Sequence, residues 1–205
     1  MRILFLADAK SYHTQRWVNY FVDRNHRCFL ITLEKGFETK AEEFFLSTKV
    51  LPPFLKYPLS LPRIKKLASK IKQDLVNAHF VPNYGLIGAL LSAGQVTQMR
   101  SEKKAHLLVI STWGSDVLIS PQKSWLHKKR AEYILSKADL VTADAMLTAE
   151  VVIGLGVKRE KVLTCPMGVE KHLLGGQKKK ERPYLSTGSK FGLILSNRKL
   201  EPLYD

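Results

Sequence analysis

The chain alternates short apolar runs with segments of helical periodicity. Residues 2–7 are apolar without a break from Ile3 onward, which is typical of a strand buried on both faces of a sheet. A polar turn follows, and then a segment that ends near residue 25 and whose apolar positions fall on one side of a helix. The start of the chain therefore predicts a strand, a loop and a helix in direct succession.

The same order of elements recurs along the chain. Further apolar runs predict strands, and the segments between them predict helices. Strands are expected at 27–33, 75–80, 106–112, 138–143 and 161–165, and helices at 85–93, 124–137 and 145–155. This alternation predicts an α/β fold of the Rossmann-like kind, in which a doubly wound, mostly parallel sheet carries helices on both faces.

The segment 44–73 departs from this pattern in its charge. It holds seven basic residues and no acidic one. Four prolines predict an irregular first half, and a stripe of apolar positions predicts a helix in the second half. An amphipathic helix packed on the sheet is one interpretation. The other is contact with an anionic membrane surface through residues 49–72, from Lys49 to Lys72.

The charge of the whole chain points to a polyanionic partner. The 205 residues carry a formal net charge of +15, with an isoelectric point near 9.8. Nucleic acid, an anionic membrane and phosphorylated small molecules all fit this charge. Nucleic acid is disfavoured because the basic residues are scattered and no nucleic-acid motif accompanies them. No apolar run approaches the roughly 18 residues of a membrane span, so we expect a cytoplasmic protein, at most peripheral on the membrane.

Composition also predicts the division into domains. Residues 1–172 are expected to form the N-terminal Rossmann-like domain, and the basic, glycine-containing stretch 173–190 a linker. The apolar run at 191–196 then predicts the first strand of a second domain, which 191–205 are too short to complete.

Candidate site residues follow three of the predicted strands. In an open parallel sheet, the loops at the carboxyl ends of the strands line the ligand crevice. The loop and helix after the first strand offer Asp8, Lys10, Ser11, His13 and Arg16. The later strand ends add a histidine and the turn at 113–116, so the predicted cleft residues are His13, Arg16, His79, Trp113, Ser115 and Asp116.

Several familiar sites are missing from the sequence. The first loop lacks the G-x-G-x-x-G pattern, whose glycines let the backbone approach a pyrophosphate. Glu34, at the end of the second predicted strand, is therefore only a weak indication of a ribose-binding acid. There is no P-loop, nucleophile elbow or pair of carboxylates, and Cys28 and Cys165 do not have the spacing of metal ligands.

Taken in order, the motifs resemble a known family. The chain is similar to retaining glycosyltransferases of family four, which have the GT-B architecture of two Rossmann-like domains facing a cleft. The motifs are DA at 8–9, HTQRW at 13–17, AH at 78–79, TWGSD at 112–116, ADLV at 138–141, MGVE at 167–170 and ILSNRKL at 194–200.

The resemblance implies transfer of a sugar from a nucleotide-sugar donor to an acceptor with retention of configuration. The acceptor would be a sugar or a lipid-linked molecule, as in cell-envelope glycans. This domain would bind the acceptor and one wall of the donor sugar, and Trp113 would stack on a sugar ring. Arg198 matches an arginine that binds the donor diphosphate. The resemblance implies no catalytic base, no metal and no other cofactor, and an N-terminal part that is inactive alone.

Two departures from the family matter for this assignment. The first loop has Ala7-Asp8-Ala9-Lys10 where many members have a glycine pair, and Trp113 stands where many have histidine. Direct backbone contact with phosphate at the first loop is therefore not expected. The alternative hypothesis is a non-catalytic Rossmann-like module that binds a polyanion such as nucleic acid.

Overall fold

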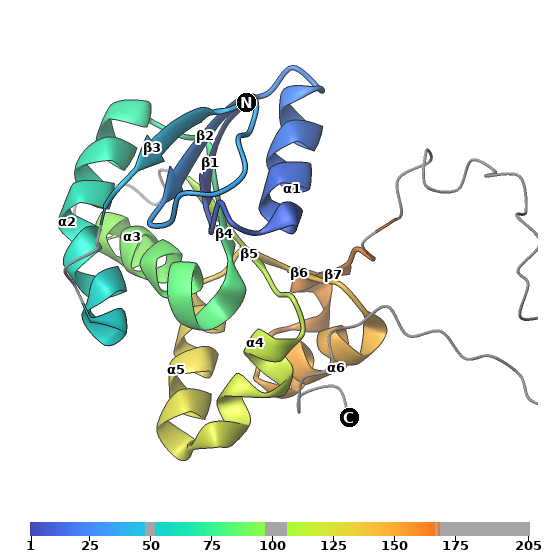
Figure 1. The fold of residues 1–205 in the computed structure, drawn as a ribbon. Helices are drawn as coiled ribbons and strands as arrows, with labels where there is room; N and C mark the ends of the chain where they lie inside the picture. The colour runs from blue at the N-terminus through green and yellow to red at the C-terminus, as the bar shows by residue number, and fades with distance from the viewer. Residues whose placement is uncertain (48–51, 97–105, 167, 169–205) are drawn as a thin grey trace, which may run out of the picture. The chain divides into compact units, whose positions relative to one another are not determined.

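The computed structural model describes residues 1–47, 52–96, 106–166 and 168. Its centre is a seven-stranded sheet in which every neighbouring pair is parallel (Figure 1). The spatial order is β3-β2-β1-β4-β5-β6-β7. The strands are β1 (Arg2–Leu6), β2 (Arg27–Thr32), β3 (Glu42–Phe45), β4 (Leu75–His79), β5 (Leu107–Ser111), β6 (Leu140–Ala143) and β7 (Val162–Thr164).

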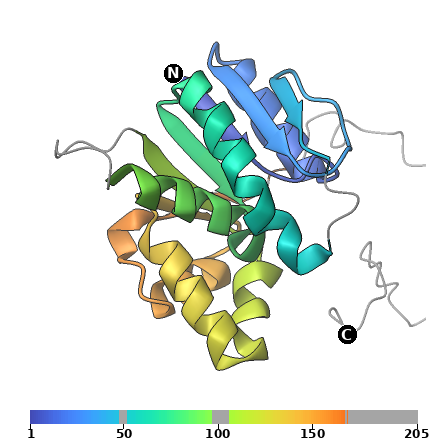
Figure 2. The ribbon, with the colours of Figure 1, turned by 90° about the vertical axis from the view of Figure 1, so that its left-hand side faces the viewer.

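Helices cover both faces of this sheet. Figure 1 shows α1 on one face, and Figure 2 shows α2, α3 and α5 side by side on the other. The α-helices are α1 (Tyr12–Val22), α2 (Pro53–Ile71), α3 (Leu86–Val96), α4 (Ser115–Leu118), α5 (Trp125–Ser136) and α6 (Met146–Gly154). A π-helix, η1 (Phe80–Gly85), and two 3₁₀ helices, η2 (Ser120–Lys123) and η3 (Arg159–Lys161), complete the described elements.

The strand β1 is apolar throughout because both of its faces are covered. Leu4 and Leu6 belong to the core under α2, α3 and α5. Ile3 and Phe5 belong to a second core under α1. Side chains of a strand alternate between the two faces of the sheet, so a continuous apolar run satisfies both cores. The predicted Rossmann-like α/β fold is confirmed.

The segment between β2 and β4 differs from the prediction in two ways. The helix α2 starts at Pro53 and contains Pro58 and Pro62, where an irregular chain was expected. Both of these prolines lie on the exposed side of the helix. The edge strand β3 was missed as well, because it is only four residues long.

The connection from β2 to β3 braces the first loop of the chain. Two parallel neighbours are usually joined through a helix, but here residues 33–41 cross without one. The Phe37 N–H donates to the Ala9 carbonyl at 2.7 Å, and Gln15 Nε2 donates to the Glu38 carbonyl at 2.9 Å. A Cβ on Gly36 would lie 2.2 Å from the carbonyl carbon and oxygen of Ala9. Only glycine permits this approach.

The remaining predictions concern the division of the chain into domains. The boundary at residue 172 stays a prediction. The linker 173–190 and the segment 191–205 lie outside the described residues. Within the described ranges, no helix combines the length and apolar character that crossing a membrane requires.

The Gly36→Ala variant should be less stable than the unmodified chain by about 1–3 kcal/mol, because the new methyl group collides with backbone that cannot move aside. The measurement is the free energy of unfolding in urea. Gly154→Ala in α6 is the matched control, since nothing lies within 4 Å of its added Cβ. Equal effects of the two changes would contradict the bracing role of the loop.

Candidate functional site

The strand order defines where a ligand crevice can form. From β1 the chain proceeds outward to β2 and β3, then returns to place β4 on the other side of β1. This reversal is a topological switch point, and open α/β sheets bind ligands beside it at the carboxyl ends of the strands. The first loop follows β1 there, and His79 ends β4.

An aromatic cluster occupies this position. The rings of His13 and Trp113 are stacked, with centroids 5.1 Å apart and planes 12° from parallel. His79 meets Trp113 edge-on at 5.3 Å. Trp17 meets His79 at 5.9 Å and Trp113 at 6.0 Å, both nearly perpendicular. The structure therefore brings together three predicted site residues from three separate segments of the chain.

His79 is the buried member of the cluster. It is 3% exposed, and neither ring nitrogen has a hydrogen-bond partner among the described residues. Burial, with a smaller contribution from His13, lowers the pKa of His79 to about 3, so its imidazole is neutral at neutral pH. A buried polar group without a partner is unfavourable by about 1–3 kcal/mol, and such groups are often retained at functional sites.

His13 is more open to solvent than His79 and lies in α1. Burial is the main cause that lowers its pKa, and the charge of Arg16 lowers it further, while Asp144 raises it. His13 and Trp17 are four residues apart on α1, so they share one side of the helix and face the cluster together. One face of Trp113 is thus covered by His13.

Asp116 joins the ends of two strands. It is fully buried, and its carboxylate accepts the N–H of Val81 at 3.0 Å and that of Trp113 at 2.9 Å. Burial raises its pKa to about 6, although these N–H donors act in the opposite direction. Asp116 therefore ties the backbone of Val81, two residues after His79, to the backbone of Trp113.

The turns on either side of Asp116 are tight. Gly114 has φ = 91°, which agrees with the turn predicted there and suits glycine. Phe80, directly after His79, has φ = 70°, a conformation that is strained for a bulky side chain. Nothing in the sequence predicted the Phe80 conformation or the π-helix η1 that begins with this residue.

The remaining predicted site residues are Arg16, Ser115 and Arg198. Arg16 places its guanidinium 5.9 Å from the centre of the Tyr12 ring and acts on His13 through its charge. Ser115 is the half-buried first residue of α4. Arg198 lies outside the described residues.

A separate polar network surrounds the first loop. The Asp8 carboxylate accepts the N–H of Lys10 at 2.8 Å. Lys10 Nζ donates to Glu34 at 3.1 Å, and Lys56 of α2 forms an ion pair with the same carboxylate. Glu34 is therefore engaged by two lysines. Lys56 was not predicted here, because its approach depends on how α2 packs.

Two further residues near the site were not predicted. Trp17 was counted only among the apolar positions of its helix, although its spacing from His13 could have indicated the shared face. Asp144 directly follows β6, which is the same signal that identified the other candidates. Its carboxylate accepts the Thr148 hydroxyl at 2.8 Å. In the described part of the chain, no three His, Cys, Asp or Glu side chains are grouped so that they could hold a metal ion.

The sequence matches the family described as "Glycosyl transferase 4-like" over residues 2–145. The chain belongs to this family, and its resemblance to the N-terminal domain of a GT-B glycosyltransferase is confirmed. Among curated proteins, no sequence relative is detected.

Solved structures share the fold at low sequence identity. HepE from Anabaena, in complex with UDP-glucose, is 18% identical with a TM-score of 0.60, covering 84% of this chain and 45% of that chain. The lipopolysaccharide outer core galactosyltransferase WaaB, in its apo form, is 14% identical with a TM-score of 0.56, covering 82% and 46%.

A third similar structure is UDP-GlcNAc 2-epimerase from Neisseria meningitidis bound to UDP-GlcNAc. It is 10% identical with a TM-score of 0.59, and the match covers 80% of this chain and 45% of that chain. The present chain thus matches less than half the length of each of these proteins and has the Rossmann-like fold of one half of a GT-B enzyme.

Replacing His79 should change how stability depends on pH. The depressed pKa of His79 contributes stability that is present above its ordinary pKa near 6.5 and is lost as the pH falls toward 3. His79→Phe removes this loss, so the stability of the variant relative to the unmodified chain should rise by about 2 kcal/mol between pH 7 and pH 5.

The measurement is urea unfolding at the two pH values. The raised pKa of Asp116 acts in the opposite direction, because a raised carboxyl pKa stabilises the fold as the pH falls toward 4. Asp116 is present in both proteins, so its effect cancels in their difference. A difference that does not change with pH would show that His79 titrates normally.

Proposed function

We propose that this chain is the acceptor-side half of a nucleotide-sugar-dependent glycosyltransferase that retains configuration. The observation that carries the proposal is the convergence of His13, His79 and Trp113 at the switch point of a chain in the glycosyl transferase 4-like family. Family membership also weighs against the alternative of a non-catalytic polyanion-binding module. The complete enzyme would need a second domain to hold the donor, so this half alone would be inactive.

The proposed donor is a nucleoside diphosphate sugar. HepE was solved with UDP-glucose and the epimerase with UDP-GlcNAc, which supports a uridine nucleotide as the first candidate. The acceptor is a sugar or lipid-linked molecule. The proposed location is the cytoplasm.

The aromatic cluster suggests a role for each of its members. The stacked pair of His13 and Trp113 offers a wall on which a sugar ring can lie. His79 is neutral and both of its ring nitrogens are buried, so it would shape the site through its edge-on contact with Trp113 and make no direct hydrogen bond to the sugar. Its low pKa makes it unsuited to act as a general acid at neutral pH.

Asp116 would act through the backbone that it holds. Its bonds to Val81 and Trp113 fix the spacing of the two strand ends. Arg16 and Ser115 remain proposed cleft residues. No general base is proposed, because positioning and stabilisation of the departing diphosphate can carry the transfer, and no metal or other cofactor is expected.

An anionic membrane is the proposed docking surface, through residues 49–72. The described exposed side of α2 carries basic side chains, and the sequence of this helix has no acidic residue. Exposed Leu59 and two exposed prolines lie on the same helix. Cations beside apolar side chains suit the surface of an anionic bilayer. The exposed basic residues are Arg63, Lys65, Lys66, Lys70 and Lys72.

Truncating the stacking residue should impair transfer. In an enzyme that joins this chain to its donor-binding domain, Trp113→Ala should lower kcat/KM by about 10- to 100-fold, since the sugar loses its wall. The assay is release of nucleoside diphosphate from a panel of UDP-, GDP- and dTDP-sugars, with the anomer of the product assigned by NMR. Trp125→Ala is the matched control, because Trp125 is 68% exposed on α5. Equal rates in both variants would refute the proposed site.

Arg198 is proposed to bind the donor diphosphate. Arg198→Ala in the same enzyme should lower kcat by about 100-fold, because a fixed guanidinium stabilises charge on the leaving group. Lys199→Ala removes a neighbouring charge and serves as the control. Unchanged transfer by the Arg198 variant would remove the diphosphate role while leaving the aromatic site in place.

A further inference from the structure

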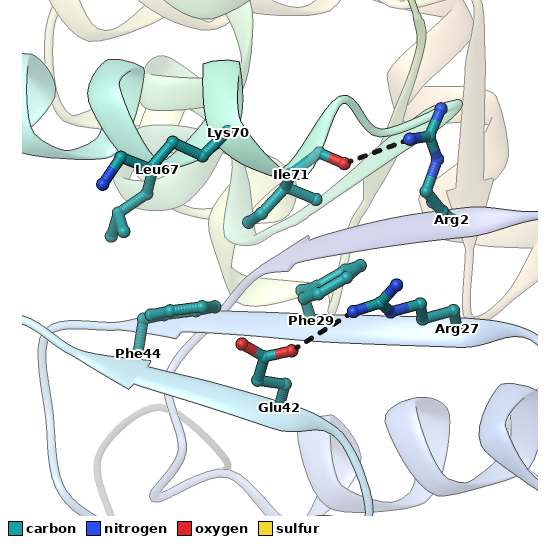
Figure 3. Close-up of a pocket in the computed structure, with 8 residues that line it drawn as sticks. All are labelled: Arg2, Arg27, Phe29, Glu42, Phe44, Leu67, Lys70 and Ile71. Carbon is teal, nitrogen blue, oxygen red and sulfur yellow. Dashed lines mark hydrogen bonds and ion pairs between the residues drawn. The ribbon is translucent and has the colours of Figure 1, made fainter.

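A pocket opens at the amino ends of the strands, whereas the candidate site lies at their carboxyl ends. Figure 3 shows it between α2 and the strands β2 and β3. Its volume is about 410 Å³, which lies within the usual range of small-molecule sites, roughly 300–1,000 Å³. Arg2, Arg27 and Glu42 begin β1, β2 and β3, so the pocket lies at the amino ends of these strands.

The inside of the pocket is apolar on two sides. Phe29 and Phe44 come from the sheet, and Leu67 and Ile71 face them from α2 (Figure 3). Leu67 and Ile71 are one helical turn apart and therefore share a face. The slot between helix and sheet is thus lined by hydrocarbon and by aromatic rings, which suits an alkyl chain.

The rim of the pocket is mainly cationic. Arg2, Arg27 and Lys70 line it together with one carboxylate, that of Glu42. Arg2 and Arg27 lie at the same end of the slot (Figure 3). Arg27 is 3.9 Å from Glu42, and Arg2 is 3.5 Å from Asp74 through its guanidinium. Arg2 Nη1 also donates to the Ile71 carbonyl at 3.5 Å (Figure 3). A guanidinium carries five N–H donors, so both arginines retain donors for an anion beyond these contacts.

We propose that this pocket takes the alkyl chain of an anionic bilayer lipid, with the lipid phosphate at Arg2 and Arg27. An apolar slot with a cationic rim matches an amphiphile that carries one phosphate. Lys70 links the pocket to the basic side of α2, because it lines the slot and also belongs to that side. A bilayer that contacts α2 therefore brings its lipids to the mouth of the pocket.

The proposed lipid is an anchor and is separate from the substrates. The strand β1 runs from Arg2 at the pocket to Leu6 beside the candidate site, about 13 Å at the usual rise per residue. A lipid in the slot would not block the candidate site at the carboxyl ends of the strands. This inference rests on the proposed membrane docking. It adds a binding site for one lipid molecule to the general attraction between the basic residues of α2 and an anionic bilayer.

Filling the pocket tests this inference. Leu67→Trp adds bulk inside the slot without changing any charge, and Leu126→Trp makes the same change at an exposed position of α5, outside the pocket and outside the proposed docking surface. The 205-residue chain is sedimented with vesicles of 70% phosphatidylcholine and 30% phosphatidylglycerol, and with pure phosphatidylcholine vesicles. Leu67→Trp should bind the anionic vesicles at least about fivefold more weakly than Leu126→Trp. Equal binding of these two variants would overturn the lipid site and leave docking through α2 intact.

A second pair of variants keeps the test decisive if Leu67→Trp does not fold. Arg27→Glu and Arg24→Glu change the net charge equally, and both arginines are exposed, but only Arg27 lines the pocket. The lipid site predicts the greater loss of vesicle binding for Arg27→Glu, again at least about fivefold. Equal losses would indicate attraction by net charge alone and overturn the site.

Monomeric alkyl phosphates separate a bilayer lipid from a soluble amphiphile. Hexyl, octyl and decyl phosphate, each below its critical micelle concentration, should bind about fourfold more tightly for each buried methylene group. Inorganic phosphate should not distinguish Leu67→Trp from Leu126→Trp. Binding of decyl phosphate by a chain that ignores all vesicles would overturn both the bilayer lipid and the docking, whereas the sugar-transfer assay would be unaffected.

Discussion

Asp116 accepts hydrogen bonds from the backbone of Val81 and of Trp113, and this ties the turn after β4 to the end of β5. The carboxylate is fully buried, so water cannot replace it as a partner for these N–H groups. His79 lies two residues before one anchor, and Trp113 is the other. The contact between their rings therefore depends on a side chain that does not itself belong to the cluster.

The sequence predicted the parts of this arrangement that local rules control. Strands such as β1 and β5 were recognised in the sequence because they are continuous apolar runs. They are apolar throughout because both faces of the sheet are covered. The polar residues after each strand identified His79 and Trp113, since parallel strands end at one edge. Glycine at 114 indicated its turn because only that residue tolerates the observed φ easily.

The features that the sequence did not reveal depend on tertiary packing. Pro58 and Pro62 argue against a helix locally, but α2 forms because its inner side is buried on the sheet. Lys56 reaches Glu34 only once α2 has docked. The burial of Asp116, and with it the bonds that it accepts from the backbone of Val81 and Trp113, follows from two separate segments meeting in space. Each of these results from long-range contacts that no local pattern encodes.

The crossing between β2 and β3 has a consequence for the energetics of ligand binding. Ala9 is bonded on both sides: its N–H donates to the Thr32 hydroxyl, and its carbonyl accepts the Phe37 N–H. With Gly36 packed against the same backbone, the first loop is already ordered before any ligand arrives. Fixing a loop residue on binding would require about 1–2 kcal/mol of conformational entropy. The first loop is therefore preorganised, so a ligand that contacts it would lose little affinity to ordering of the loop.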